Sequence, residues 1–194
     1  MVEFITNIDF EILYWMQENL RCAFLDGFAW VLSTCFEAGL LWMALCVVLF
    51  VFRRTRPLSV AVTIAIALTF LIGELALKNT ICRPRPCHID PSVSLAVPVP
   101  NSYSFPSGHT GSSFAAATAL FCFSKKWGIP CLAVATIVGL SRMYLFVHYP
   151  TDVLAGVLLG TFAAVVTFLV MKKYGLDKRL ENPLLKKRII MKKA

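Results

Sequence analysis

Long apolar stretches dominate the chain, and each is interrupted only by isolated charged residues. Five of them reach or approach the roughly 20 residues that cross a bilayer core. The third is short and rich in small residues, which predicts close packing inside a bundle. The pattern predicts an all-α integral membrane bundle of about five transmembrane helices. We expect the spans at about 28–52, 57–77, 107–124, 128–147 and 151–171.

The first 21 residues follow a different pattern. Apolar residues recur there at helical spacing between acidic ones, without the basic start and the continuous apolar core of a signal peptide. We assign residues 1–21 as an amphipathic helix lying on the membrane surface. A helix packed on the loops of the bundle is the alternative. The apolar stripe consists of Ile5, Ile8, Ile12, Trp15 and Met16.

Composition supports a membrane protein of one domain, residues 1–194. Hydrophobic residues make up 58% of the chain and charged residues 15%, with a mean hydropathy of +0.71. Such an apolar chain is not disordered, and seven cysteines are too few for a disulfide-stapled miniprotein. The net charge of +8 does not indicate nucleic-acid binding, because nine of the nineteen basic residues lie in the tail, residues 172–194.

The basic residues also predict the orientation. In a five-span topology, fourteen of them fall on one side and five on the other. The positive-inside rule then places the C-terminus in the cytoplasm and the N-terminus outside. The proline-rich loop 78–106 lies on the outer side, and loops of this length are commonly functional.

Polar residues from three separate stretches gather on the outer side of this topology. Three cations among them suit an anion with several oxygens, because arginine offers forked donors and lysine a point charge. The start of the third span adds free N–H groups and a positive dipole end. The residues are Lys78, Arg85, Ser107, Gly108, His109, Arg142, His148 and Asp152.

Two histidines in this group supply the groups that phosphoryl transfer needs. One of His109 and His148 would attack phosphorus, and the other would protonate the leaving oxygen. Asp152 follows His148 by four residues, so its carboxylate would hold one imidazole nitrogen protonated and leave the other free to attack. Arg142 lies in an apolar stretch at a cost of roughly 2.5–3.5 kcal/mol, which favours a functional role.

Three motifs carry a resemblance to a known family. Residues 78–86 match the pattern KxxxxxxRP, residues 106–109 read PSGH, and residues 141–152 match SRxxxxxHxxxD. The first motif alone is weak, whereas all three in this order form a strong signal. The chain from about residue 57 to 172 therefore resembles the type 2 phosphatidic acid phosphatase (PAP2) superfamily.

The resemblance implies a membrane lipid phosphatase that needs no metal and no other cofactor. In that family, the position of His148 is the nucleophile that forms a phosphohistidine, that of Asp152 orients it, and that of His109 is the general acid. The membrane members commonly have six spans, whereas this chain starts directly with the amphipathic segment. The positions that hold phosphoryl oxygens correspond to Lys78, Arg85, Ser107, Gly108 and Arg142.

Several other polar residues leave alternatives open. Glu74 lies four residues before Lys78, so it either positions that lysine through a salt bridge or serves as a structural partner inside the bundle. Arg83 is either an additional substrate contact or a charge at the rim. Cys82 and Cys87 either form a disulfide on the outer side or remain free thiols. No role is assigned to Glu37 or His88.

Other functional classes explain the sequence less well. A non-enzymatic transporter or channel would account for intramembrane charges but not for two histidines beside three cations. A soluble vanadate-dependent haloperoxidase of the same superfamily conflicts with the five spans. Among lipid phosphates, an external active face favours undecaprenyl diphosphate, with phosphatidylglycerophosphate and phosphatidic acid as alternatives. The expected partners are this substrate and the membrane lipids; the sequence predicts no oligomeric state.

Overall fold

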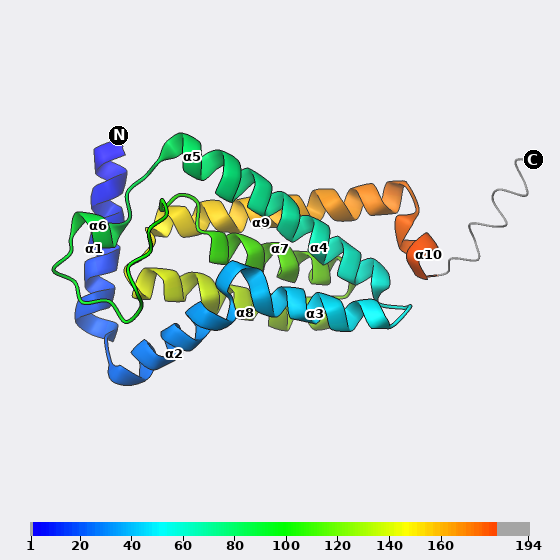
Figure 1. Ribbon diagram of the computed structural model, residues 1–194, viewed down its shortest axis with the longest axis horizontal. Helices are drawn as coiled ribbons and strands as arrows, with labels where there is room; N and C mark the ends of the chain where they lie inside the picture. Colours follow the sequence, from blue (N-terminus) through cyan, green and yellow to red (C-terminus); the bar gives the residue numbers. More distant parts are fainter. Residues whose placement is uncertain (1, 182–194) are drawn as a thin grey trace, which may run out of the picture.

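Four helices lie side by side along the long axis of the protein (Figure 1). The computed structural model describes residues 2–181, and within that range every regular element is helical. The central helix, α7, packs against the other three. This arrangement confirms the predicted all-α bundle. The four helices are α4 (Arg56–Phe70), α7 (Gly108–Phe123), α8 (Lys125–Tyr144) and α9 (Pro150–Lys173).

Small residues allow α7 and α9 to approach each other closely. A Cβ atom added to Gly160 would lie 2.8 Å from the backbone nitrogen of Ala115 and would also meet the carbonyl of Gly111. A Cβ atom added to Gly156 would lie 2.8 Å from the carbonyl oxygen of Ser107. Glycine is therefore required at these positions because a side chain would overlap the neighbouring backbone. The predicted close packing of the small-residue segment is confirmed.

The structure does not confirm the predicted count of five spans. Within residues 2–181, three helical stretches are long and apolar enough to cross a membrane, or four if a bent pair forms one span. The bent pair is α2 (Ala23–Cys35) and α3 (Leu40–Val51), and α7 has only 16 residues. The three stretches are Arg56–Ile89, Lys125–Tyr144 and Pro150–Lys173.

The first predicted span is broken where its charged residue lies. The helices α2 and α3 meet at 52° through a short 3₁₀ turn, Glu37–Gly39. Gly39 takes a left-handed conformation with φ 75°, which glycine adopts without steric cost. The continuous apolar pattern of residues 28–52 did not reveal this break, which brings Glu37 to the side of α7.

A π-helical segment follows α4 and ends next to the start of α7. It spans Leu71–Leu77 and continues into the short helix α5 (Lys78–Ile81). Cys82 ends α5 with φ 49°, and a turn leads to α6 (Pro86–Ile89). Cys82 and Cys87 are both free thiols, so the disulfide alternative is not supported.

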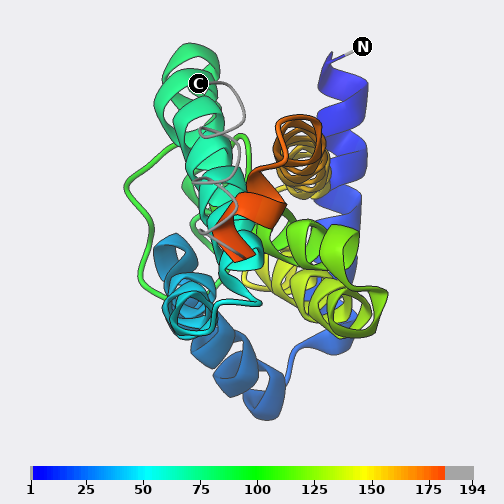
Figure 2. The same cartoon turned by 90° about the vertical axis from the view of Figure 1, so that its right-hand side faces the viewer.

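The N-terminal helix α1 (Val2–Leu20) crosses one end of the bundle and packs on α8 and α9 (Figures 1 and 2). One face of the helix is buried and includes Asp9, Leu13 and Met16. The helix thus contacts the bundle, as the alternative predicted, and also exposes most of its apolar stripe, as an interfacial helix would. The exposed large residues include Phe4, Ile5, Ile8, Ile12 and Trp15.

The basic links lie at the opposite end of the bundle from α1. The α3–α4 link, the start of α8 and the last helix, α10 (Leu176–Glu181), are all found there (Figure 1). Of the predicted basic tail, residues 182–194 lie outside the described residues. The described part nevertheless separates a basic end from an end crossed by an amphipathic helix.

Candidate active site

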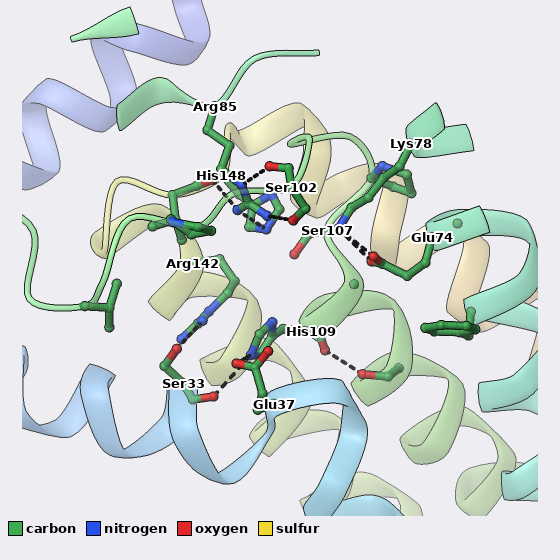
Figure 3. Close-up of a pocket in the computed structure, with 18 of the residues that line it drawn as sticks. Ser33, Glu37, Glu74, Lys78, Arg85, Ser102, Ser107, His109, Arg142 and His148 are labelled. Carbon is green, nitrogen blue, oxygen red and sulfur yellow. Dashed lines mark hydrogen bonds and ion pairs between the residues drawn. The ribbon is translucent and has the colours of Figure 1, made fainter. Parts of the chain in front are cut away.

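A cavity of about 590 Å³ lies where α7 begins and α8 ends. The helix α1 contacts the same end of the bundle, at Tyr144 and Thr151. The cavity walls come mainly from α2, the end of α4, the π-helical segment, α5, the loop before α7, the start of α7, the end of α8 and the turn that follows α8. Seven of the eight predicted site residues line the cavity, and six of these are labelled in Figure 3, while Asp152 is not among the lining residues. The seven are Lys78, Arg85, Ser107, Gly108, His109, Arg142 and His148.

His148 lies in the turn between α8 and α9, and its two ring nitrogens have different partners. Arg85 Nη1 lies 3.0 Å from Nε2, and arginine can only donate, so Nε2 carries the lone pair. Burial lowers the pKa of His148 to about 3, which keeps the imidazole neutral at physiological pH. The unprotonated nitrogen therefore faces the cavity.

The other nitrogen of His148 faces a buried carboxylate. Nδ1 lies 3.6 Å from Oδ2 of Asp152 and 3.4 Å from the hydroxyl of Ser104. Ser104 in turn donates a short hydrogen bond to Oδ2 of Asp152. The same oxygen accepts the backbone N–H of Tyr149 at 2.9 Å, which closes a capping box at the start of α9. The carboxylate is thereby fixed beside Nδ1, as the spacing of the two residues predicts.

His109 enters the cavity from the first turn of α7. Its Nε2 lies 3.2 Å from the carbonyl oxygen of Ser33 and 3.5 Å from Oε2 of Glu37. Both partners belong to the region where α2 ends and the chain bends toward α3. This histidine thus approaches the cavity from a different side than His148 does (Figure 3).

Arg85 is held in place by backbone oxygens. Its Nε donates to the carbonyl of Ser102 at 2.7 Å and Nη1 to the carbonyl of Val147 at 2.9 Å. The side chain is 4% exposed and has no carboxylate partner within the described part of the chain. A buried guanidinium without a carboxylate partner leaves a positive charge available to a bound anion.

Arg142 is likewise buried without a carboxylate in direct contact among residues 2–181. It is 2% exposed and donates to the hydroxyls of Ser33, at 2.8 Å, and Ser141, at 3.0 Å. These contacts draw α2 and α8 together across the cavity. Hydrogen bonds to these neutral hydroxyls lower the free-energy cost of burying Arg142 in an apolar helix. They do not cancel its positive charge.

Lys78 and Glu74 form a salt bridge of 2.8 Å beside the start of α7. The carboxylate of Glu74 also lies against Gly108, where a Cβ atom would overlap it. The positioning alternative for Glu74 is therefore the one that the structure supports. Ser107 is the N-cap residue of α7, but its side chain makes no capping hydrogen bond; its buried hydroxyl lies 2.9 Å from that of Thr110.

Sequence reasoning missed four residues around the site. Ser104 bridges Asp152 and His148, Ser33 bridges Arg142 and His109, and Glu37 lies beside His109. Asp9 binds Arg83, which in turn binds Asp152. Only the intramembrane charge of Glu37 was a signal in the sequence; the other contacts depend on how distant segments pack. Arg83 contacts carboxylates and is not among the cavity-lining residues, so it is neither a simple rim charge nor a direct contact there.

Comparison with known proteins decides the family. The model of the PAP2 superfamily matches residues 56–175, which include all three motifs. The chain belongs to the PAP2 superfamily. It is 31% identical over 180 residues to an undecaprenyl-diphosphatase of Sulfolobus acidocaldarius, covering 92% of this chain and 86% of that protein. It is 28% identical over 197 residues to a lipid A 4'-phosphatase of Bacteroides thetaiotaomicron, covering 94% of this chain and 84% of that protein.

A solved PAP2 structure has the same fold. The transmembrane PAP2-type phosphatidylglycerolphosphate phosphatase of Bacillus subtilis superposes with a TM-score of 0.73 at 24% identity, covering 87% of each chain. The PAP2 relatives and the apolar helices together identify this chain as a membrane lipid phosphatase. Within residues 2–181, no group of three or more His, Cys, Asp or Glu side chains is arranged to hold a metal ion.

Proposed function

We propose that this PAP2 phosphatase hydrolyses lipid phosphates or diphosphates through a phosphohistidine on His148. The observation that carries the proposal is the state of that side chain. Its imidazole is buried and neutral, with Nε2 directed to a cavity rich in cations and Nδ1 beside a fixed carboxylate. A nucleophilic imidazole oriented by a carboxylate in this way is the arrangement that covalent phosphoryl transfer requires.

In the first step, Nε2 of His148 attacks phosphorus, and the bond from phosphorus to the leaving oxygen breaks. His109 gives a proton to that oxygen as it leaves. The lost hydrogen bond between Arg85 and Nε2 is replaced by one from Arg85 to a phosphoryl oxygen. Asp152 stabilises the positive imidazole of the phosphohistidine. A water molecule then attacks phosphorus, passes its proton to His109, and releases inorganic phosphate and free His148.

In this proposal, Lys78, Arg85, Arg142 and the backbone at Ser107 and Gly108 form an anion cradle, which supplies electrostatic stabilisation without a metal. Lys78, Arg85 and Arg142 surround the cavity with positive charge, and among residues 2–181 only Lys78 is paired with a directly contacting carboxylate. The backbone at Ser107 and Gly108 adds the positive end of α7. Charge that develops on the equatorial oxygens would meet preorganised donors in a buried site, where they act most strongly.

For the physiological lipid, we favour undecaprenyl diphosphate. The relative from Sulfolobus acidocaldarius is named an undecaprenyl-diphosphatase and aligns with 92% of this chain. A diphosphate also suits several cations, and its leaving group is a phosphate, which departs more readily than a lipid alkoxide. Phosphatidylglycerophosphate and phosphatidic acid are the alternatives. The relative named lipid A 4'-phosphatase adds a phosphorylated saccharolipid to them.

We further propose that the cavity faces the outside of the cell and that the C-terminus is cytoplasmic. The fourteen-to-five distribution of basic residues in the five-span topology supports this orientation. The structure describes basic links at one end of the bundle and the cavity toward the other. The head group would then enter from the outer leaflet while the apolar tail stays in the bilayer, with α1 at the interface.

A substrate panel tests the choice of lipid. Purified enzyme in one detergent, with EDTA present, should hydrolyse undecaprenyl diphosphate with a kcat/KM at least tenfold above that for each of the three alternatives. Phosphate release, with the His148→Ala variant as the blank, measures the rate. A tenfold preference for a glycerolipid monophosphate or for lipid A would overturn the choice of substrate, and loss of activity in EDTA would overturn the metal-free mechanism.

A further inference from the structure

A chain of buried polar contacts connects the N-terminal helix to the carboxylate behind His148. Arg83 Nη1 donates to Oδ1 of Asp152 at 2.7 Å, and Arg83 Nη2 donates to Oδ2 of Asp9 at 2.8 Å. Both carboxylates are almost completely buried, at 1% exposure for Asp9 and 0% for Asp152. One guanidinium therefore bridges a residue of α1 and the partner of the nucleophile.

Thr151 contacts both Arg83 and Asp9. Its hydroxyl accepts from Arg83 at 2.8 Å and donates to Oδ2 of Asp9 at 2.6 Å. Its backbone N–H donates to Oδ1 of Asp9 at 3.1 Å. Asp9 thus accepts a hydrogen bond from one of the N–H groups in the first turn of α9, which have no partner within the helix. The guanidinium stacks on the ring of Tyr149, 3.8 Å from its centroid. Arg83 thus has little freedom to move away from Asp152.

The two carboxylate oxygens of Asp152 have different partners. Oδ2 faces Nδ1 of His148 and also accepts the hydroxyl of Ser104 and the N–H of Tyr149. Oδ1 is bound by Arg83. Because a carboxylate is planar, fixing Oδ1 also fixes the direction in which Oδ2 faces the imidazole.

We propose that Arg83 and Asp9 are positioning residues for the His148–Asp152 pair, so that α1 completes the active site. Arg83 holds Asp152 in the orientation that directs Nδ1–H, and Asp9 holds Arg83. This inference rests on the proposed function of His148. It also explains why an acidic residue is buried on a helix whose opposite face is apolar and exposed.

A merely structural role predicts a different outcome from a positioning role. If the network served only to attach α1, its loss would resemble the loss of any other attachment of α1. Tyr14 provides such an attachment, since its hydroxyl donates to Oδ2 of Asp90 at 2.8 Å and takes no part in the contacts of Arg83 with Asp9 and Asp152. Tyr14→Phe is therefore a matched control, which keeps the ring and removes one polar contact of the same helix.

The test compares Asp9→Asn, Arg83→Gln, Arg83→Lys and Tyr14→Phe in full-length enzyme in detergent. Steady-state kinetics with undecaprenyl diphosphate give kcat and KM, and inorganic phosphate as a competitive inhibitor reports on the anion cradle. We expect kcat to fall about 10–100-fold in Arg83→Gln and less in Asp9→Asn, with KM and phosphate inhibition within about twofold of wild type. Arg83→Lys should recover part of the loss, and Tyr14→Phe should match wild type.

Three results would overturn the inference. The first is a kcat in both Arg83→Gln and Asp9→Asn no lower than in Tyr14→Phe. The second is a parallel loss of turnover and phosphate inhibition, which indicates a generally disturbed cavity. If Arg83→Gln does not fold, Asp9→Asn decides alone, and a wild-type kcat in it is the third result. Failure of the proposed function is seen separately, because His148→Ala would then retain the activity of the wild type.

Discussion

Burial and charge have their most direct chemical consequence at His148. Its burial lowers the pKa of the imidazole to about 3, so the ring is protonated only in strong acid and stays neutral as the pH rises above that value. A lysine or an unperturbed histidine would be partly or fully protonated at neutral pH and would lack the free electron pair. Burial thus keeps the proposed nucleophile unprotonated.

This state of His148 leads to a prediction for spectroscopy. In enzyme labelled with ¹⁵N-histidine, the ring signals that disappear in His148→Ala should stay constant between pH 5 and pH 8. The reason is that the lowered pKa lies well below this range. Ring nitrogen chemical shifts from a pH series provide the measurement. A titration midpoint between pH 5 and pH 8 for these signals would contradict a buried, neutral nucleophile.

His109 allows a second prediction at the same scale. His109→Ala should lower kcat for a lipid phosphomonoester by about 10²-fold or more, because the leaving alkoxide no longer receives a proton. With p-nitrophenyl phosphate, whose leaving group needs no proton, the loss should be much smaller. The ratio of the two losses is the measurement. Equal losses on both substrates would show that His109 serves binding or folding instead of acid catalysis.

The three motifs were sufficient to predict seven residues that line one cavity, because each motif keeps its residues within a short, locally structured segment. The neighbours of those residues were not predictable. Ser33, Ser104 and Asp9 contact the site only because distant segments pack together, and nothing in their spacing distinguishes them from other polar residues. Arg83 was noticed in the sequence, but its partner on α1 could not be inferred.

At the scale of elements, apolar periodicity located the helices and missed their irregularities. The long spans near α4, α8 and α9 follow from apolar stretches with only isolated charged residues. The bend at Glu37–Gly39 and the π-helical segment Leu71–Leu77 leave no comparable pattern, because an apolar run is equally compatible with a straight helix. Both irregularities lie beside the cavity, where π-helical turns are often functional.

The contact of α7 with α9 gives a prediction about stability. Gly160→Ala should destabilise the protein by about 1–3 kcal/mol, because the new methyl group overlaps backbone atoms of α7. Gly27→Ala is the matched control, since a Cβ atom there meets nothing within 4 Å and alanine favours a helix. Thermal unfolding in detergent provides the measurement. Equal midpoints for the two variants would argue against the close approach of these helices.

In the molecule as a whole, the basic links and the cavity lie at opposite ends of the bundle. The cavity is lined by the start of α7 and the end of α8, near α1, and the basic links lie at the other end of the bundle (Figure 1). This asymmetry between the two ends is what a multi-span protein needs if anionic head groups are to reach the site from one leaflet only. The exposed apolar face of α1 would lie in the same leaflet as the substrate.

Topology reporters test this arrangement in cells. A reporter fused after Ala194 should be active in the cytoplasm, and a tag inserted within residues 88–100 should react with a membrane-impermeant reagent on intact cells. The expectation follows from the asymmetry of basic residues. A tag that reacts only after the cells are opened would invert the orientation and remove the basis for an outer-leaflet substrate.

Trapping the phosphohistidine tests the proposed mechanism at its covalent step. Wild-type enzyme mixed with undecaprenyl diphosphate labelled with ³²P at the terminal phosphate should, on rapid quenching in alkali, carry a label that acid removes. Mass spectrometry should place the phosphate on His148, and His148→Ala should remain unlabelled. Turnover by the wild type with the label on another residue, or undiminished turnover by His148→Ala, would contradict the account.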